Sequence, residues 1–277
     1  MEQGKRAWRG DYLLWVEAFV ISNFAFLVLD IYMAHSVNAF RHWAEYIPLY
    51  FSIGAPLFLT AALLARYQGK ALQWILMGHI VGWGALATGL SGVLFHLQSA
   101  FFLERTLKSL TYAAPFAAPL AYAGLGLLLI LNRMIPSQSK EWAQWVLLLA
   151  LGGFAGNFVL SLTDHAINGF FYATEWLPVI SSAFAVGFLT IPFFTLVNRR
   201  YLVVCAFVVL SQAFVGVLGF AFHLAANLKG PSTDMLRTFI DGAPPFAPLL
   251  LPNLMVLALI SLWALDAAGP ERTEENT

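Results

Sequence analysis

The sequence is poor in charge and in cysteine. Charged residues make up 11% of its 277 residues, the formal net charge is zero, and Cys205 is the one cysteine. A single cysteine excludes a disulfide framework and a thiolate metal cluster. The sequence has no basic block, which argues against nucleic acid as a partner. It also lacks a G-x-S-x-G elbow, an H-E-x-x-H helix and a phosphate-binding glycine-rich loop, which excludes the common hydrolase, zinc-protease and nucleotide-binding classes.

Apolar residues dominate instead. They make up 60% of the chain, and the mean hydropathy is +0.73, so we expect an integral membrane protein whose main surroundings are a lipid bilayer. Membrane-spanning strands would be shorter and would alternate, so the fold class is all-α. Eight apolar stretches are long enough to span a bilayer as helices: Leu13–Ala34, Ile47–Leu64, Leu72–Leu97, Tyr112–Leu131, Trp142–Leu162, Leu177–Val197, Leu202–Leu224 and Phe246–Leu265.

The basic residues predict the orientation in the membrane. With both termini in the cytoplasm, ten of the fifteen lysines and arginines fall in cytoplasmic segments. Those ten include residues near the two termini, namely Lys5, Arg6, Arg9 and Arg272. We therefore expect cytoplasmic N and C termini in a multi-pass protein of the bacterial inner (cytoplasmic) membrane.

The chain is an internal repeat. Five residues recur 130 positions later: His35, Asn38, Phe40, Glu45 and Pro48 return as His165, Asn168, Phe170, Glu175 and Pro178. We divide the chain into repeat 1 (11–133), a cytoplasmic linker (134–140) and repeat 2 (141–266), with four predicted helices in each repeat. Because four is even, both repeats enter the membrane in the same sense. The expected architecture is two tandem, parallel four-helix bundles.

Two histidine pairs are the strongest functional signal. His35 ends the first predicted helix and His96 ends the third, and His165 and His223 occupy the same places in repeat 2. First and third helices run in the same direction and are diagonal in a four-helix bundle, so each pair should face across the core near the outer, periplasmic surface. Haem iron accepts one imidazole from each side. This pattern predicts two b-type haems, each with two histidine ligands.

Glycines and cations accompany each pair. Gly89 and Gly92 share a helix face with His96, and Gly216 and Gly219 share one with His223, which would leave a groove for a porphyrin edge. The alternative is close helix packing. Lys108 and Arg237 are duplicated cations at the height where haem propionates would emerge.

Asn38 and Asn168 could hydrogen-bond the second ring nitrogen of the preceding histidine, or simply turn the chain. Glu45 and Glu175 suit the first turn of the next helix. They would complete the ligand set if the metal were non-haem copper or iron. Bacteriochlorophyll, which needs one imidazole, is another alternative cofactor. A small-molecule transporter is the alternative function, because prolines interrupt several helices.

Four polar residues are not duplicated. His79 lies deep in the third helix, about 25 Å from His96, without an obvious partner. Glu17, Asp30 and Asp164 are costly near a bilayer and are therefore functional candidates. We expect Glu17 to extend toward the cytoplasmic surface, and Asp30 or Asp164 to reach water or to take part in quinol deprotonation.

The layout of eight helices in two bundles, each with a histidine pair toward the outer face, resembles the duplicated four-helix b-type haem membrane proteins such as haem A synthase. The histidines here lie on the first and third helices of each unit, whereas in that family they lie on the second and fourth. Short segments, Ala87-Thr88-Gly89-Leu90 and Ala118-Pro119-Leu120-Ala121, look like parts of the large subunit of quinol oxidase bd. The resemblance implies b-type haem, electron transfer between quinol and a periplasmic partner, and membership of a larger redox complex.

Overall fold

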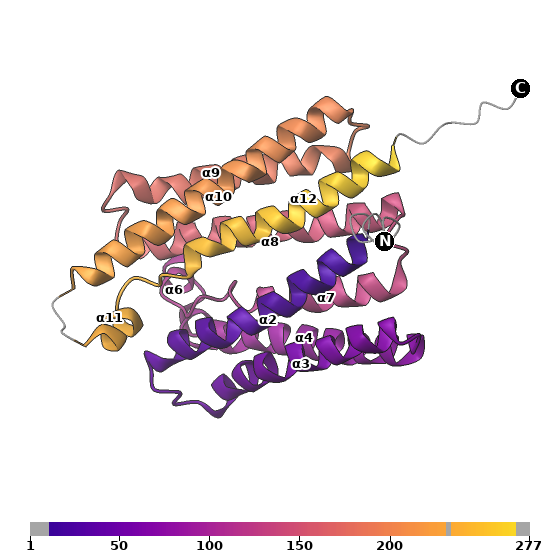
Figure 1. Cartoon of the computed structure of the whole chain (residues 1–277). Coiled ribbons are helices and arrows are strands. Elements are labelled where there is room, and N and C mark those ends of the chain that lie inside the picture. Colours follow the sequence, from indigo (N-terminus) through magenta and orange to yellow (C-terminus); the bar gives the residue numbers. More distant parts are fainter. Residues whose placement is uncertain (1–10, 231–233, 270–277) are drawn as a thin grey trace, which may run out of the picture.

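The computed structural model describes residues 11–230 and 234–269, and within them every regular element is a helix (Figure 1). Lys5, Arg6, Arg9 and Arg272 lie outside these ranges. The eight principal helices are α2 (Tyr12–Ser36), α3 (Tyr46–Tyr67), α4 (Ala71–Gln98), α7 (Leu120–Met134), α8 (Lys140–Ile167), α9 (Trp176–Thr190), α10 (Arg199–Leu228) and α12 (Leu250–Ala268). Shorter pieces connect them: η1 (Trp43–Glu45), α5 (Phe101–Glu104), α6 (Leu107–Thr111), η2 (Ala173–Glu175), η3 (Ile191–Phe193), α11 (Met235–Asp241) and η4 (Ala247–Leu249).

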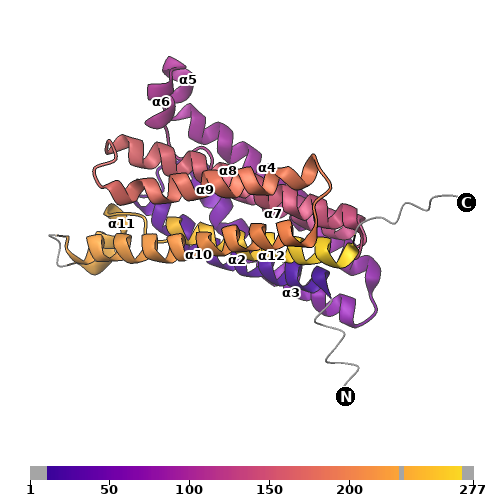
Figure 2. The same ribbon diagram turned by 90° about the horizontal axis from the view of Figure 1, so that it is seen from above.

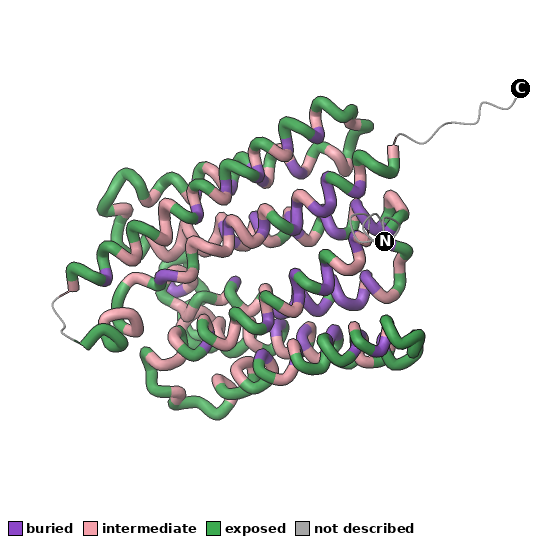
Figure 3. Tube along the Cα trace, in the orientation of Figure 1, coloured by how far each residue is buried: buried purple, intermediate pink, exposed green. Residues whose placement is uncertain are grey.

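Seven helices of the described chain are long and apolar enough to cross a membrane. Much of their surface is exposed, and buried residues gather along the middle of the molecule (Figure 3). Large apolar side chains on the outside of so many long helices are stable in lipid and costly in water. The chain therefore has the fold of a multi-pass, all-α membrane protein.

The eighth expected span is shorter than predicted. We expected a helix over Tyr112–Leu131, but residues 112–119 form turns and α7 begins at Leu120. Its 15 residues reach only about 22 Å at 1.5 Å per residue, less than the hydrocarbon thickness of about 30 Å. Pro115 and Pro119 explain the late start, because proline lacks the amide that a helix interior needs.

Each repeat forms one four-helix bundle. In repeat 1, α2 and α4 each pack against both α3 and α7, which makes α2 and α4 diagonal. In repeat 2, α8 and α10 are diagonal in the same way, with α9 and α12 between them. The bundles meet where α7 packs on α8 and α2 packs on α12. Each outer connection also reaches the other repeat, since α6 contacts α8 and α11 contacts α2.

Both ends of the described chain lie at one end of the molecule, and α6 and α11 lie at the opposite end (Figures 1 and 2). This arrangement agrees with two repeats that run in the same sense. The assignment of one end to the cytoplasm remains a prediction.

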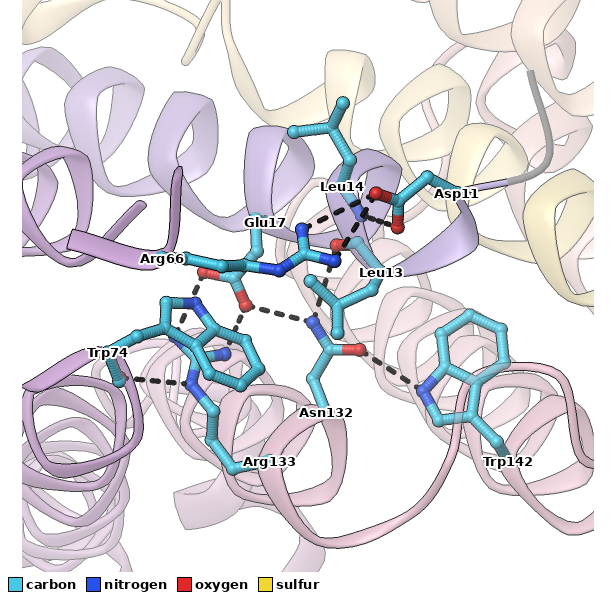
Figure 4. Close-up of polar contacts among 9 residues, drawn as sticks. All are labelled: Asp11, Leu13, Leu14, Glu17, Arg66, Trp74, Asn132, Arg133 and Trp142. Atoms are coloured by element: carbon cyan, nitrogen blue, oxygen red, sulfur yellow. Dashed lines mark hydrogen bonds and ion pairs between the residues drawn. The ribbon is translucent and has the colours of Figure 1, made fainter. Parts of the chain in front are cut away.

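A buried ion pair lies near the chain ends of repeat 1 (Figure 4). The Arg133 guanidinium on α7 forms a double contact with the Glu17 carboxylate on α2, including Nη2 to Oε2 at 3.1 Å, and both side chains have no exposed surface. The expectation that Glu17 extends to the surface is therefore wrong. The carboxylate stays inside because Arg133 neutralises it there, and a buried charge without such a partner would be very costly.

Neighbouring helices complete the network around this pair. Asn132 donates to Glu17 Oε1 at 2.8 Å and accepts from Trp142 Nε1 at 3.1 Å, which ties repeat 1 to α8. The Trp74 ring lies 4.1 Å below the Arg133 guanidinium carbon, and the Trp74 carbonyl accepts from Arg133 Nε at 3.4 Å. The pair is thus held by groups from α2, α4, α7 and α8.

Candidate functional site

The structure brings the predicted histidines together in two pairs. The ring centroids of His35 and His96 are 6.2 Å apart, and those of His165 and His223 are 6.4 Å apart. The ring planes are nearly perpendicular in both repeats, at 75° and 80°. Each pair joins the C-terminal ends of two diagonal helices, at the end of the molecule away from the chain termini.

One histidine of each pair is held by a backbone carbonyl. His96 Nδ1 lies 2.9 Å from the Pro115 oxygen, and His223 Nδ1 lies 2.7 Å from the Pro244 oxygen. A carbonyl oxygen only accepts, so Nδ1 must carry the proton and donate. In the neutral ring this leaves a lone pair on Nε2. The turns that interrupt the following helix thus supply the oxygen that orients each ring.

The other histidine of each pair lies beside a carboxylate. His35 Nδ1 is 3.6 Å from Glu45 Oε2, and His165 Nδ1 is 3.7 Å from Glu175 Oε2. Both Oε2 atoms are buried and have no hydrogen-bond partner in the described chain. A buried carboxylate oxygen beside Nδ1 favours a proton on that nitrogen. All four Nε2 atoms are then left without a hydrogen bond among the described residues.

Asn38 plays a different part from the one we expected. Its side-chain amide donates to Glu45 Oε1 at 3.1 Å and not to an imidazole. The backbone amide of His42 donates to the same oxygen at 3.3 Å, and His42 Nδ1 caps η1 by accepting from Ala44 N at 3.2 Å. Glu45 is thus both a helix-start residue and the partner of His35. Asn168 ends α8 in repeat 2, where its backbone amide donates to the His165 carbonyl at 3.2 Å.

A duplicated aromatic residue in a strained conformation adjoins each pair. Phe40 and Phe170 have φ values of 51° and 53°, in the left-handed region that bulky residues rarely adopt. Their amides donate to the His35 and His165 carbonyls at 3.1 Å. Each ring stacks on the residue that begins the next helix, with centroids 4.9 Å apart at Tyr46 in repeat 1.

In repeat 2 the corresponding ring distance is 3.8 Å, from Phe170 to Trp176. The Phe40 ring is 5.8 Å from His35 and the Phe170 ring is 6.2 Å from His165. Strain of this kind persists where surrounding contacts hold it, often at functional sites. The sequence signalled these two residues by their recurrence, but it gave no indication of the backbone conformation.

The groove expected along the glycines is filled by a neighbouring helix. A Cβ on Gly89 would lie 2.5 Å from the Ala123 amide, and one on Gly216 would lie 2.4 Å from a Pro252 ring carbon. Gly92 faces Pro119, directly before α7, and Gly219 faces Pro248 in η4, directly before α12. A porphyrin edge cannot lie there. These glycines allow close packing of α4 on α7 and of α10 on α12, which was the alternative interpretation.

The predicted propionate partners lie on the crossing helices. Lys108 is on α6 and Arg237 is on α11, so each belongs to a segment that packs against the first helix of the other repeat. Both side chains are exposed, and Arg237 Nε lies 3.4 Å from Asp241 Oδ2. Within the described residues, neither cation has a contact with a histidine of the pairs. Their role toward a cofactor remains a prediction.

The remaining polar candidates stand apart from the pairs. His79 lies on α4, and its buried Nδ1 has no hydrogen bond in the described chain. Asp30 lies five residues before His35, and Asp164 directly precedes His165. Neither carboxylate forms a hydrogen bond or ion pair with a described residue. The structure joins neither of them to a site.

The described residues contain no group of three or more histidine, cysteine, aspartate or glutamate side chains arranged to hold a metal ion. Glu45 and Glu175 contact the Nδ1 edge of their histidines, so they do not complete a ligand set with the Nε2 atoms. Comparison of the chain with family models, with curated proteins and with solved structures finds no match.

Proposed function

We propose that each repeat binds one b-type haem between its two histidines and that the protein transfers electrons. The observation that carries this proposal is the close imidazole pair, present once in each repeat at a similar spacing. Two imidazoles bound at about 2 Å on opposite sides of one metal have ring centroids about 6 Å apart. The observed 6.2 and 6.4 Å fit that spacing.

The number of protein donors favours haem over a bare metal ion. Structural zinc and most non-haem copper or iron sites need three or four protein ligands, and the described residues offer two at each pair. Haem brings its own porphyrin nitrogens, so it would need only the two histidines of each pair from the protein, His35 with His96 or His165 with His223. When bound, it would supply a one-electron redox couple.

The groups behind the histidines also support ligation. Histidine ligands usually donate their second N–H to a carboxylate or a backbone carbonyl, which fixes the tautomer and raises the basicity of the ligand. Each pair has one of each, the carboxylate of Glu45 or Glu175 and the carbonyl of Pro115 or Pro244. The buried negative charge would stabilise ferric iron and so lower the reduction potential.

The position of the pairs supports exchange of electrons at one membrane surface. Both lie at the same end of the molecule, opposite the chain termini. With the predicted orientation this end faces the periplasm. We propose that quinol from the bilayer donates electrons there and that another membrane or periplasmic redox subunit accepts them.

Absorption spectra of the purified protein test the proposal. We expect a Soret band and two haem irons per chain. His96→Ala and His223→Ala should each remove about half of the band, because each substitution removes one axial ligand of one haem. His79→Ala is the matched control, since His79 lies on α4 outside the pairs and does not support them, and it should keep the full band.

Colourless, iron-free protein would refute the proposal, and so would an equal loss in the His79→Ala control. Copper or iron without porphyrin would instead indicate a bare metal, and a red-shifted magnesium pigment would indicate bacteriochlorophyll. Electron paramagnetic resonance adds an independent readout. Imidazoles held at the observed ring-plane angles of 75° and 80° would give a bound ferric haem a strongly anisotropic low-spin signal.

A further inference from the structure

The two repeats differ at the chain-terminal end, where α9 is followed by α10. In repeat 2, α9 ends at Thr190, and η3 and a non-helical segment follow. In repeat 1 the corresponding helix, α3, continues to Tyr67. Pro192 explains the difference, because the residue 130 positions earlier is Ala62, which a helix accommodates.

An outward-facing apolar groove lies along the second half of α9, beside the start of α10. It is lined by Ala183, Phe184, Gly187, Phe188, Ile191 and Tyr201. Phe184 and Ile191 are well exposed, and a Cβ added to Gly187 would have no atom within 4 Å. The Tyr201 hydroxyl is satisfied by the Phe188 carbonyl at 3.0 Å, so the groove offers no free polar group from that side chain. Its apolar lining suits a hydrocarbon chain.

Two arginines, Arg199 and Arg200, begin α10 and directly precede the groove-lining Tyr201. Arg200 is exposed and has no ion pair with a described residue. Arg199 is 82% exposed and lies 3.4 Å from Asp266, an exposed pair that contributes little and separates easily. Repeat 1 has Leu72 and Gln73 at these positions, 127 residues earlier, so the adjacent arginine pair belongs to the groove-bearing repeat.

We infer that this groove binds an anionic phospholipid, with an acyl chain along α9 and the phosphate at Arg199 and Arg200. Lipid is the solvent of this surface, and arginines beside an apolar groove at a membrane interface attract anionic headgroups. Charge complementarity therefore selects the headgroup, while the apolar lining holds the chain. The site does not depend on haem, because it lies at the opposite end of the molecule from the histidine pairs.

Native mass spectrometry of the delipidated full-length protein tests this inference. The protein is titrated with phosphatidylglycerol or with phosphatidylcholine that carries the same acyl chains. We expect tighter binding of phosphatidylglycerol, and its affinity should fall about fivefold for each arginine removed in Arg199→Gln and Arg200→Gln. Lys70→Gln is the matched control, since it removes one exposed cation from the same end of repeat 1, and it should leave both affinities unchanged.

The groove itself is tested with Gly187→Leu, whose side chain has room to occupy it. This variant should lose binding of both lipids. Gly54→Leu on α3 also places leucine in open space, in the repeat without the arginine pair, and should bind as the original protein does. Equal affinity of the original protein for the two lipids would overturn the inference. So would an Arg200→Gln variant that behaves like Lys70→Gln.

Discussion

The ion pair between Glu17 and Arg133 is present in one repeat only, and this asymmetry makes its energetic role testable. The equivalent positions in repeat 2, 130 and 129 residues later, hold Leu147 and Leu262, and both leucines are buried. The same position in the fold is therefore occupied by an ion pair in repeat 1 and by two leucines in repeat 2. The apolar form supplies the design for a double substitution.

Removing one partner should destabilise the protein strongly. Glu17→Leu would leave the Arg133 guanidinium fully buried, with only the Trp74 carbonyl and ring as polar partners. Breaking a buried pair in this way costs about 3–5 kcal/mol. At about 2–4 °C per kcal/mol, the melting temperature should fall by about 6–20 °C. Arg133→Leu should have a similar effect, because it leaves the carboxylate buried.

Replacing both partners should have little effect. A buried ion pair exchanged for apolar residues of similar volume is often neutral or stabilising, since the cost of desolvating two charges disappears. We expect the Glu17→Leu/Arg133→Leu variant to be within about 1 kcal/mol of the original or above it. Gly78→Ala should be harmful only while Arg133 is present, because its Cβ would lie 2.1 Å from the guanidinium. Repeat 2 has Cys205 at the position of Gly78, 127 residues later.

The same cysteine supplies the assay. Cys205 is the one cysteine of the chain and is fully buried, so a thiol-reactive fluorophore reports unfolding as the temperature rises. The reasoning would be refuted if the double variant lost as much stability as the two single losses added together. It would also fail if each single substitution cost less than about 1 kcal/mol, because the pair would then be effectively solvated.

Two further substitutions test the packing and the site. Gly216→Ala should destabilise the protein by about 1–3 kcal/mol, because the new Cβ would lie 2.4 Å from a proline ring carbon. Gly152→Ala is the control, because its Cβ would meet no atom within 4 Å, and it should leave the stability unchanged. Equal melting temperatures of the two variants would contradict the packing role of Gly216. Glu45→Gln should weaken haem binding by about 10–100-fold and raise the reduction potential, because a neutral amide makes His35 a weaker base. Haem titration measures the affinity and potentiometry measures the reduction potential, and the control is Glu104→Gln, which replaces an exposed carboxylate. Identical values for the Glu45→Gln and Glu104→Gln variants would show that the Glu45 carboxylate does not act on His35.

Local pattern was enough to predict most of the fold. A mean hydropathy this high and apolar runs of helix length place the chain in a bilayer as helices, and seven of the eight spans are long enough. The fourth helix was placed too early because the apolar run crosses Pro115 and Pro119. Prolines delay the start of a helix without making the segment polar, so hydropathy alone does not show where the helix begins.

The sequence by itself determined that the chain is built from two similar helical units and that four histidines occupy equivalent helix ends. A repeat in sequence imposes a repeat in structure, so duplicated positions had to become equivalent places. Only the tertiary structure decided what each polar group contacts. Glu45 meets the histidine while Asn38 holds Glu45, and prolines fill the glycine stripe. Glu17 meets Arg133, 116 positions away. Such contacts depend on which helix faces cross, and helical periodicity places a residue on a face without naming the neighbour that covers it.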